Sequence, residues 1–157
     1  RQRRLSSLVE DHRPYGQAVM RWLSQRQPEV LEAECMVASV EHGYSGRFDL
    51  RARIDGATPR TDFKSVSDWR YIEEGKKYPP YSENALQIDL YEGDAVESGY
   101  PPADYGLIVR LGPDGTFEET AFELNPERGI AILGAYRAIS SAGSALRKGL
   151  PELRLAA

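Results

Sequence analysis

The amino-acid sequence predicts an α/β fold in which a central mixed sheet is flanked by helices. Three observations support this prediction. An amphipathic helical pattern lies near the start, three β-prone segments divided by turn signals follow, and a later hairpin signal precedes a long helical segment. With one further helix between the two β-rich regions, the predicted order of elements is α-βββ-α-ββ-α.

The first helix is predicted to begin at Pro14 and to end before Pro28, because proline is favoured in the first helical turn and stops a helix further along. Apolar side chains recur on one face of this segment at helical spacing, namely Tyr15, Ala18, Val19, Trp22 and Leu23. Residues 1–13 contain three arginines among the first four positions, which predicts a flexible basic arm.

Three strands are predicted next, as an antiparallel meander. The first covers residues 30–40, residues 42–46 are expected to turn, and the second strand, residues 47–54, alternates apolar and charged side chains. Gly46 is interpreted as a turn residue that would also let a phosphate approach the backbone. Residues 55–56, an Asp-Gly pair, predict a tight turn before a short third strand at residues 60–66.

A long loop and a helix are predicted after the meander. Residues 67–80 are polar, contain two prolines and show no regular period, which is typical of a functional loop. Ser82 is a suitable cap for a helix that runs to about Glu97.

The remaining sequence predicts a hairpin and a last helix. Two β-prone segments, residues 105–111 and 117–124, flank a Gly-Pro-Asp-Gly turn. Asn125 and Pro126 then mark the cap and first turn of a helix that reaches about residue 148.

Composition and charge narrow the class of protein. A chain of 157 residues, 41% of them hydrophobic, can bury one core, so residues 14–157 are expected to form a single domain. The apolar runs are too short to cross a bilayer, and a cytoplasmic protein without membrane contact is expected. The single cysteine, Cys35, cannot hold an iron–sulfur cluster by itself, so any metal must be bound mainly through oxygen. A net charge of −4 means that nucleic-acid binding would depend on a local basic surface and on bound cations.

The main chemical signal is Asp62-Phe63-Lys64 on the third predicted strand. Residues two apart on a strand share a face, so the Asp62 carboxylate and the Lys64 ammonium should project together while Phe63 points to the core. Asp49 lies on the neighbouring strand of the meander and is expected beside Asp62. Two adjacent carboxylates repel one another unless a cation lies between them. Mg²⁺ or Mn²⁺, held by both aspartates and the Phe63 backbone carbonyl, is the expected occupant.

A third acidic ligand is expected on the preceding strand. Glu34 is the preferred candidate, and Glu32 remains an alternative on the same predicted strand face. Lys64 would orient or deprotonate a water molecule and stabilise the charge that develops at phosphorus.

Each of these residues also has a purely structural interpretation. Exposed Asp–Lys pairs are common on strands. Gln87 and Tyr91, four apart on the predicted helix, would form a half-buried polar stripe without any other role. The combination with the paired aspartates favours a functional site. Arg47 is then a candidate phosphate contact and Tyr81 a candidate for stacking on unpaired bases.

Four stretches, taken together and in this order, resemble the RecB-like exonuclease branch of the PD-(D/E)XK nuclease superfamily, which includes CRISPR-associated and phage exonucleases. These stretches are ECMV at 34–37, GYSGRFDL at 43–50, TDFKS at 61–65 and YSENALQIDLY at 81–91. The resemblance covers roughly residues 30 to 92.

The resemblance implies a restriction-endonuclease-like αβββαβ core and a role for each matching position. Glu34, Asp49, Asp62 and Lys64 would form the metal and catalytic site, while the helical glutamine and tyrosine would contact the site and the nucleic acid. Some members of this branch carry an iron–sulfur cluster on four cysteines, which the single cysteine of this chain does not allow. The chain has no Gly-rich phosphate-binding loop, so a helicase or recombination partner would be a separate polypeptide.

Two functional hypotheses follow. The first is a divalent-metal-dependent DNA nuclease, more specifically an exonuclease acting in DNA recombination, repair or phage DNA processing. The alternative is a non-catalytic nucleic-acid- or protein-binding module that retains the nuclease fold. A hydrolase of another phosphodiester is a third interpretation of the same residues.

Overall fold

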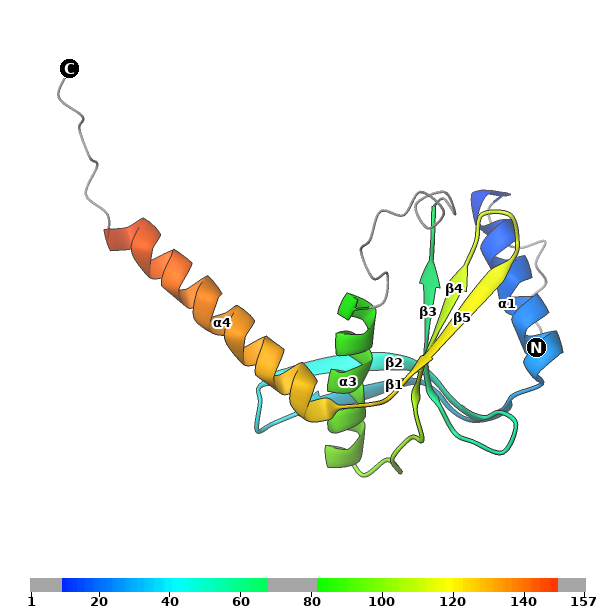
Figure 1. Cartoon of the computed structure of the whole chain (residues 1–157), viewed down its shortest axis with the longest axis horizontal. Helices are drawn as coiled ribbons and strands as arrows, with labels where there is room; N and C mark the ends of the chain where they lie inside the picture. Colours follow the sequence, from blue (N-terminus) through cyan, green and yellow to red (C-terminus); the bar gives the residue numbers. More distant parts are fainter. Residues whose placement is uncertain (1–9, 68–81, 150–157) are drawn as a thin grey trace, which may run out of the picture.

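The computed structural model describes residues 10–67 and 82–149 and contains a five-stranded mixed sheet with helices on both faces (Figure 1). The α/β class and the order α-βββ-α-ββ-α predicted from sequence are confirmed. In chain order the elements are the 3-10 turn η2 (Glu10–His12), α1 (Arg13–Arg26), β1 (Glu29–Ser39), β2 (Tyr44–Arg53), β3 (Arg60–Ser65), α3 (Ser82–Glu97), β4 (Gly106–Leu111), β5 (Phe117–Phe122) and α4 (Pro126–Gly149).

The strands lie in the order β1-β2-β3-β4-β5, and only the β3–β4 pair is parallel. The predicted meander of β1, β2 and β3 is therefore confirmed. β3 pairs with β4 along its whole length, from Arg60 to Ser65. Its pairing with β2 covers only Leu50–Thr61 and Arg51–Arg60. Beyond Thr61 the two strands separate, which leaves one edge of β3 without a backbone partner on the β2 side.

The two faces of β3 meet different helices. Phe63 packs edge-on against Trp22 of α1, with ring centroids 5.2 Å apart, and belongs to the main apolar cluster with strand residues such as Leu50 and Val109. The alternate residues of β3 point to the other face and reach α3, as the Arg60–Glu92 contact shows. Strand alternation therefore turns the charged residues of β3, Arg60, Asp62 and Lys64, toward α3 and turns Phe63 toward α1.

Two predicted turns and one predicted cap are confirmed. Asp55 and Gly56 both have positive φ, 50° and 87°, as a tight Asp-Gly hairpin turn requires. The Gly112 N–H donates to the Thr116 carbonyl across the β4–β5 turn. The Asn125 side chain accepts from the Arg128 N–H at 3.0 Å and caps α4.

The predicted turn at residues 42–46 is wrong in its extent. β2 already begins at Tyr44, because the chain reverses over residues 40–43, where Gly43 has a φ of 65° and its N–H donates to the Ser39 carbonyl. Gly46 therefore lies inside β2 and is not a turn residue.

The basic arm predicted for residues 1–13 also needs correction. Glu10–His12 form a 3-10 turn that leads directly into α1, which begins at Arg13. Residues 1–9 lie outside the described residues, as do residues 68–81 and with them nearly all of the predicted functional loop. Within the described part of the chain, no helix is long and apolar enough to cross a membrane.

Candidate active site

A row of polar side chains runs along the α3-facing side of β3. Lys64 Nζ lies 2.8 Å from Asp62 Oδ2 and donates to Gln87 Oε1 of α3, also at 2.8 Å. The Asp62 side chain is 5% exposed and that of Lys64 is 29% exposed, so the aspartate is buried and the lysine reaches solvent. The Asp62 and Lys64 side chains therefore project side by side, as predicted.

Asp49 reaches β3 at the point where β2 and β3 separate. Leu50 pairs with Thr61, so the next step of the same register would place Asp49 beside Asp62. Instead of continuing the backbone ladder, Asp49 Oδ2 accepts the Phe63 N–H at 2.8 Å. The side chain thus satisfies a backbone donor that the missing strand pairing would leave open.

The electrostatics of Asp62 suit a site that binds a cation. Burial raises the pKa of Asp62, the nearby Lys64 ammonium partly offsets that rise, and the negative charge of Asp49 adds to it. The Asp62–Lys64 contact is short enough for an ion pair, but the buried Oδ2 atom accepts no well-directed hydrogen bond. A buried carboxylate oxygen in this state has capacity for a further positive partner.

The predicted pair on α3 extends the network. Gln87 Nε2 donates to Tyr91 Oη, while Gln87 Oε1 faces Lys64. Lysine can only donate, so this orientation of the amide is the one that satisfies all three groups. The Tyr91 ring lies directly over Gly46, where a Cβ atom would come within 2.2 Å of Tyr91 Cε1. Gly46 therefore makes room for an aromatic ring, and the predicted approach of a phosphate to its backbone does not fit.

The predicted third acid does not complete a metal-binding group with the aspartates within the described residues. Glu34 has a left-handed φ of 56°, is mostly exposed and pairs with Arg47 at 3.0 Å. The alternative, Glu32, is bound by Arg51. Both Glu32 carboxylate oxygens accept from Arg51 Nη1, at 3.0 and 2.7 Å. Over residues 10–67 and 82–149, no group of three or more His, Cys, Asp or Glu side chains is arranged to hold a metal ion. Because Glu34 has a left-handed backbone conformation, its side chain does not follow the regular alternation of a strand.

Two further residues, Arg47 and Tyr81, were predicted to contact nucleic acid. Arg47 is on β2, mostly exposed and engaged by Glu34. Tyr81 lies outside the described residues.

Sequence reasoning missed two residues next to this row. Arg60 forms a buried ion pair with Glu92, and Arg110 of β4 lies in register with Lys64. Arg110 was hidden because its parallel pairing with Lys64 follows from the fold, and Arg60 because its partner Glu92 lies on α3. The only available signal was the placement of a cation among apolar residues in a strand that is buried along its length.

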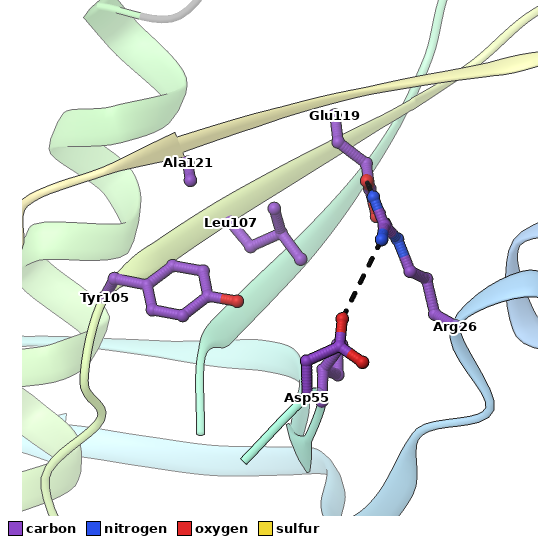
Figure 2. A pocket seen from close by; sticks show the side chains of 7 residues that line it. Arg26, Asp55, Tyr105, Leu107, Glu119 and Ala121 are labelled. Atoms are coloured by element: carbon purple, nitrogen blue, oxygen red, sulfur yellow. Dashed lines mark hydrogen bonds and ion pairs between the residues drawn. The ribbon is translucent and has the colours of Figure 1, made fainter. Parts of the chain in front are cut away.

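A surface pocket of roughly 290 Å³ lies elsewhere, on the α1 side of the sheet (Figure 2). Figure 2 shows Arg26 between Asp55 and Glu119 at its rim, with Leu107 and Tyr105 nearby. Glu119 is already bound by Arg26 and by Trp22 Nε1, so the charged groups of this pocket satisfy one another. Nothing in it matches the predicted hydrolytic chemistry.

Comparisons with known proteins add little to this geometry. No protein-family model matches the chain, and no curated protein matches it. Among solved structures, one titled "Crystal structure of SSO0001" is similar, with a TM-score of 0.48 and 15% sequence identity. The match covers 80% of this chain and 57% of that chain. Fold and site together define an α/β protein with Asp62 and Lys64 on the central strand β3 and Asp49 on the neighbouring strand β2.

Proposed function

We propose that this protein is a divalent-metal-dependent nuclease that hydrolyses DNA phosphodiester bonds. We infer further that it is an exonuclease of the RecB-like kind, acting in DNA recombination, repair or phage DNA processing. The observation that carries the proposal is the position of Lys64, held between Asp62 and Gln87 while Asp49 is bonded to the same strand. A lysine beside paired carboxylates is the set of groups that metal-assisted phosphodiester hydrolysis needs.

The side chains present fit a hard divalent cation. Asp62 has a buried oxygen without a directed hydrogen bond, and its raised pKa reflects burial and the charge of Asp49, two effects that a cation would relieve. Asp49, Asp62 and the Phe63 backbone carbonyl would hold Mg²⁺ or Mn²⁺, with water completing the coordination. Such an ion, when bound, polarises a phosphoryl oxygen and lowers the pKa of a bound water.

The side chains around the carboxylates would position the reacting groups. The Lys64 ammonium donates to an incoming water or to a phosphoryl oxygen, and its contact with Gln87 fixes its direction. Tyr91 in turn holds the Gln87 amide through its hydroxyl. The network therefore restricts the rotamers of a long, flexible lysine before the substrate arrives, which lowers the entropy cost of positioning it.

The test is a digestion of end-labelled linear and circular DNA by the wild type, Asp62→Ala and Lys64→Ala, with and without Mn²⁺. We expect the wild type to shorten linear DNA only with metal. Each variant should lose about 10²- to 10⁴-fold in rate, which is the usual contribution of a positioned acid–base or charged group. Circular dichroism and thermal unfolding check that each variant is folded. Full activity of both folded variants would refute the assignment.

The Glu34–Arg47 ion pair favours one second candidate, a module that binds nucleic acid or protein without cleaving it. If the third acid stays in that pair, the two aspartates alone would have to hold the metal. Such a module should bind DNA equally well in the presence of chelator and after Asp49→Asn substitution. Binding that requires both the metal and Asp49 would exclude it.

A further inference from the structure

The Lys64 ammonium is in contact with the carboxylate that would hold a metal ion. Lys64 Nζ lies 2.8 Å from Asp62 Oδ2, and the Asp62 side chain is only 5% exposed. A buried carboxylate needs a positive partner, because little water reaches it. Asp49, which accepts the Phe63 N–H of the same strand, brings a second negative charge to this region. Without a metal ion, Lys64 therefore supplies the positive charge that the two aspartates need.

The contact between Lys64 and Asp62 has the properties of one that can be exchanged. Although Nζ and Oδ2 are close, Oδ2 accepts no well-directed hydrogen bond. The Lys64 side chain is 29% exposed, so its ammonium remains hydrated when it moves away from Asp62. The stem of a lysine is long and flexible, which lets the ammonium move while the backbone of β3 stays in place. The ion pair is therefore short but not fixed in direction.

Gln87 gives the ammonium a second acceptor, which carries no charge. Its Oε1 accepts from Lys64 Nζ at 2.8 Å, and its amide nitrogen donates to Tyr91 Oη. A neutral amide is not a ligand that a divalent cation would take in preference to two carboxylates. The Lys64–Gln87 contact can therefore persist when a cation binds the aspartates, whereas the Lys64–Asp62 contact competes with that cation for the same oxygen.

We propose that Lys64 is an internal counter-ion of the metal site, which a divalent ion displaces from Asp62 when it binds. This inference rests on the proposed nuclease function and adds a means of regulation to the same site. Lys64 lowers the affinity for the metal, because the ion has to replace the ammonium at Asp62 and also bind near its remaining positive charge. The ammonium becomes available to a water or a phosphoryl oxygen only once the metal is bound, so the ion itself releases the lysine for hydrolysis.

The experiment measures Mn²⁺ binding by isothermal titration calorimetry, without DNA, for the wild type and three variants. Lys64→Met removes the charge but keeps a flexible apolar side chain, and it should bind Mn²⁺ about tenfold more tightly than the wild type. Arg53→Met is the matched control. It removes one positive charge from β2, where Arg53 and its partner Glu29 are both more than half exposed, and should leave the Mn²⁺ affinity within about twofold. Asp62→Asn should lose Mn²⁺ binding, which places the measured ion at this site.

Thermal unfolding gives a second readout that needs neither DNA nor cleavage. In EDTA, Lys64→Met should have a lower Tm than the wild type, because its aspartates have lost their counter-ion. Added Mn²⁺ should raise the Tm of Lys64→Met by more than that of the wild type, since a ligand that binds the folded protein more tightly stabilises it more. Lys64→Gln, which is also neutral, should behave in the same way and replaces Lys64→Met if the latter does not fold.

A parallel digestion of DNA by the wild type separates the counter-ion role from the nuclease function. If the wild type cleaves and Lys64→Met binds Mn²⁺ no more tightly than Arg53→Met does, the counter-ion role is refuted and the nuclease remains. If Lys64→Met binds Mn²⁺ more tightly than that control but the wild type never cleaves, the counter-ion role stands and the nuclease fails. Unchanged Mn²⁺ binding in Asp62→Asn also overturns the inference, because the measured ion would then lie elsewhere.

Discussion

Two cationic side chains of β3, Arg60 and Lys64, project toward α3 from the same face but differ in their exposure to solvent. Arg60 is fully buried, and its Nε donates to Glu92 Oε2 at 2.8 Å. Its guanidinium carbon lies 4.4 Å from the centre of the Phe48 ring. Lys64, four residues along the strand, is 29% exposed and divides its ammonium between Asp62 and Gln87.

The difference shows how one strand face can serve two purposes. The Arg60–Glu92 pair is removed from solvent, and Glu92 Oε1 also accepts the Ala103 N–H, which ties α3 to the segment before β4. A pair removed from water in this way cannot exchange partners without a large penalty. The Lys64 end faces solvent and keeps groups that a ligand can take over. The structural cation Arg60 and the candidate site residue Lys64 are thus only four residues apart on the same face of β3.

The largest expected effect is on the free energy of unfolding when the buried Arg60–Glu92 pair is broken. Arg60→Ala should lower the free energy of unfolding by about 3 to 5 kcal/mol, because Glu92 would remain as an uncompensated buried charge. Urea denaturation followed by circular dichroism measures this change. Arg53→Ala is the matched control, since the Arg53–Glu29 pair is more than half exposed on both sides and should contribute less than about 1 kcal/mol. Equal effects of the two substitutions would show that burial does not distinguish these pairs.

A second test uses the other buried acid of α3. Burial raises the pKa of Asp94 from 3.8 to about 6; the neighbouring Tyr44 hydroxyl opposes the shift and Glu97 adds to it. The folded protein therefore binds the Asp94 proton more tightly than the unfolded chain does. Its contribution to stability is present below about pH 4 and is lost as pH rises through about 6. Unlike Glu92, neither Asp94 oxygen accepts a well-directed hydrogen bond.

The variant Asp94→Asn should remove this pH dependence. Relative to the wild type, its free energy of unfolding should increase between pH 4 and pH 7 by an amount on the order of 3 kcal/mol. Chemical denaturation of both proteins at the two pH values gives the difference directly. A constant difference between variant and wild type across this range would contradict a raised Asp94 pKa.

A third prediction concerns the packing of the Tyr91 ring on Gly46, next to Gln87 and Lys64. Gly46→Ala should displace the Tyr91 ring, because its Cβ atom would lie 2.2 Å from Tyr91 Cε1, and should cost about 1 to 3 kcal/mol of stability. The Gln87–Lys64 contact should loosen with it, so the DNA cleavage rate should also fall. Gly134→Ala is the control, since that helical position has open space and alanine there should stabilise by up to about 1 kcal/mol. An unchanged cleavage rate in Gly46→Ala would separate Tyr91 from the site.

The smallest expected effect on stability is at Glu34. Glu34→Ala removes an exposed ion pair with Arg47 and should change the free energy of unfolding by less than about 1 kcal/mol. The cleavage rate decides its other role. A loss of about 100-fold or more in Mg²⁺ with unchanged stability would mean that Glu34 leaves Arg47 to join the aspartates when metal binds. A normal rate would remove Glu34 from the site. Glu32→Ala is the comparison, and it should be more costly because Arg51 is 8% exposed.

The elements of the fold were largely predictable because their signals are local. Proline and asparagine mark helix starts, an Asp-Gly pair takes up two positive φ values, and period-two alternation marks β2. The same alternation correctly placed Asp62 with Lys64, and helical spacing placed Gln87 with Tyr91. These relations depend on a few consecutive residues of one chain segment.

The features that were not predicted arise where local rules do not apply. Glu34 was chosen as the acid on the strand before Asp49, and its left-handed backbone and its ion pair with Arg47 were not predicted. Gly46 was assigned to a turn, yet its reason is the Tyr91 ring on a helix 45 residues away in the sequence. Neither contact has a signature in the neighbouring residues.

The sequence by itself determined the order of the elements and which side chains share a face within one strand or one helix, since backbone geometry repeats every two or 3.6 residues. Tertiary structure alone decided the parallel pairing that sets Arg110 beside Lys64, the divergence of β2 from β3 that directs Asp49 to the Phe63 N–H, and the burial that separates Arg60 from Lys64. The physical reason is that burial and long-range register arise from how whole elements pack, and no short stretch of residues carries that information.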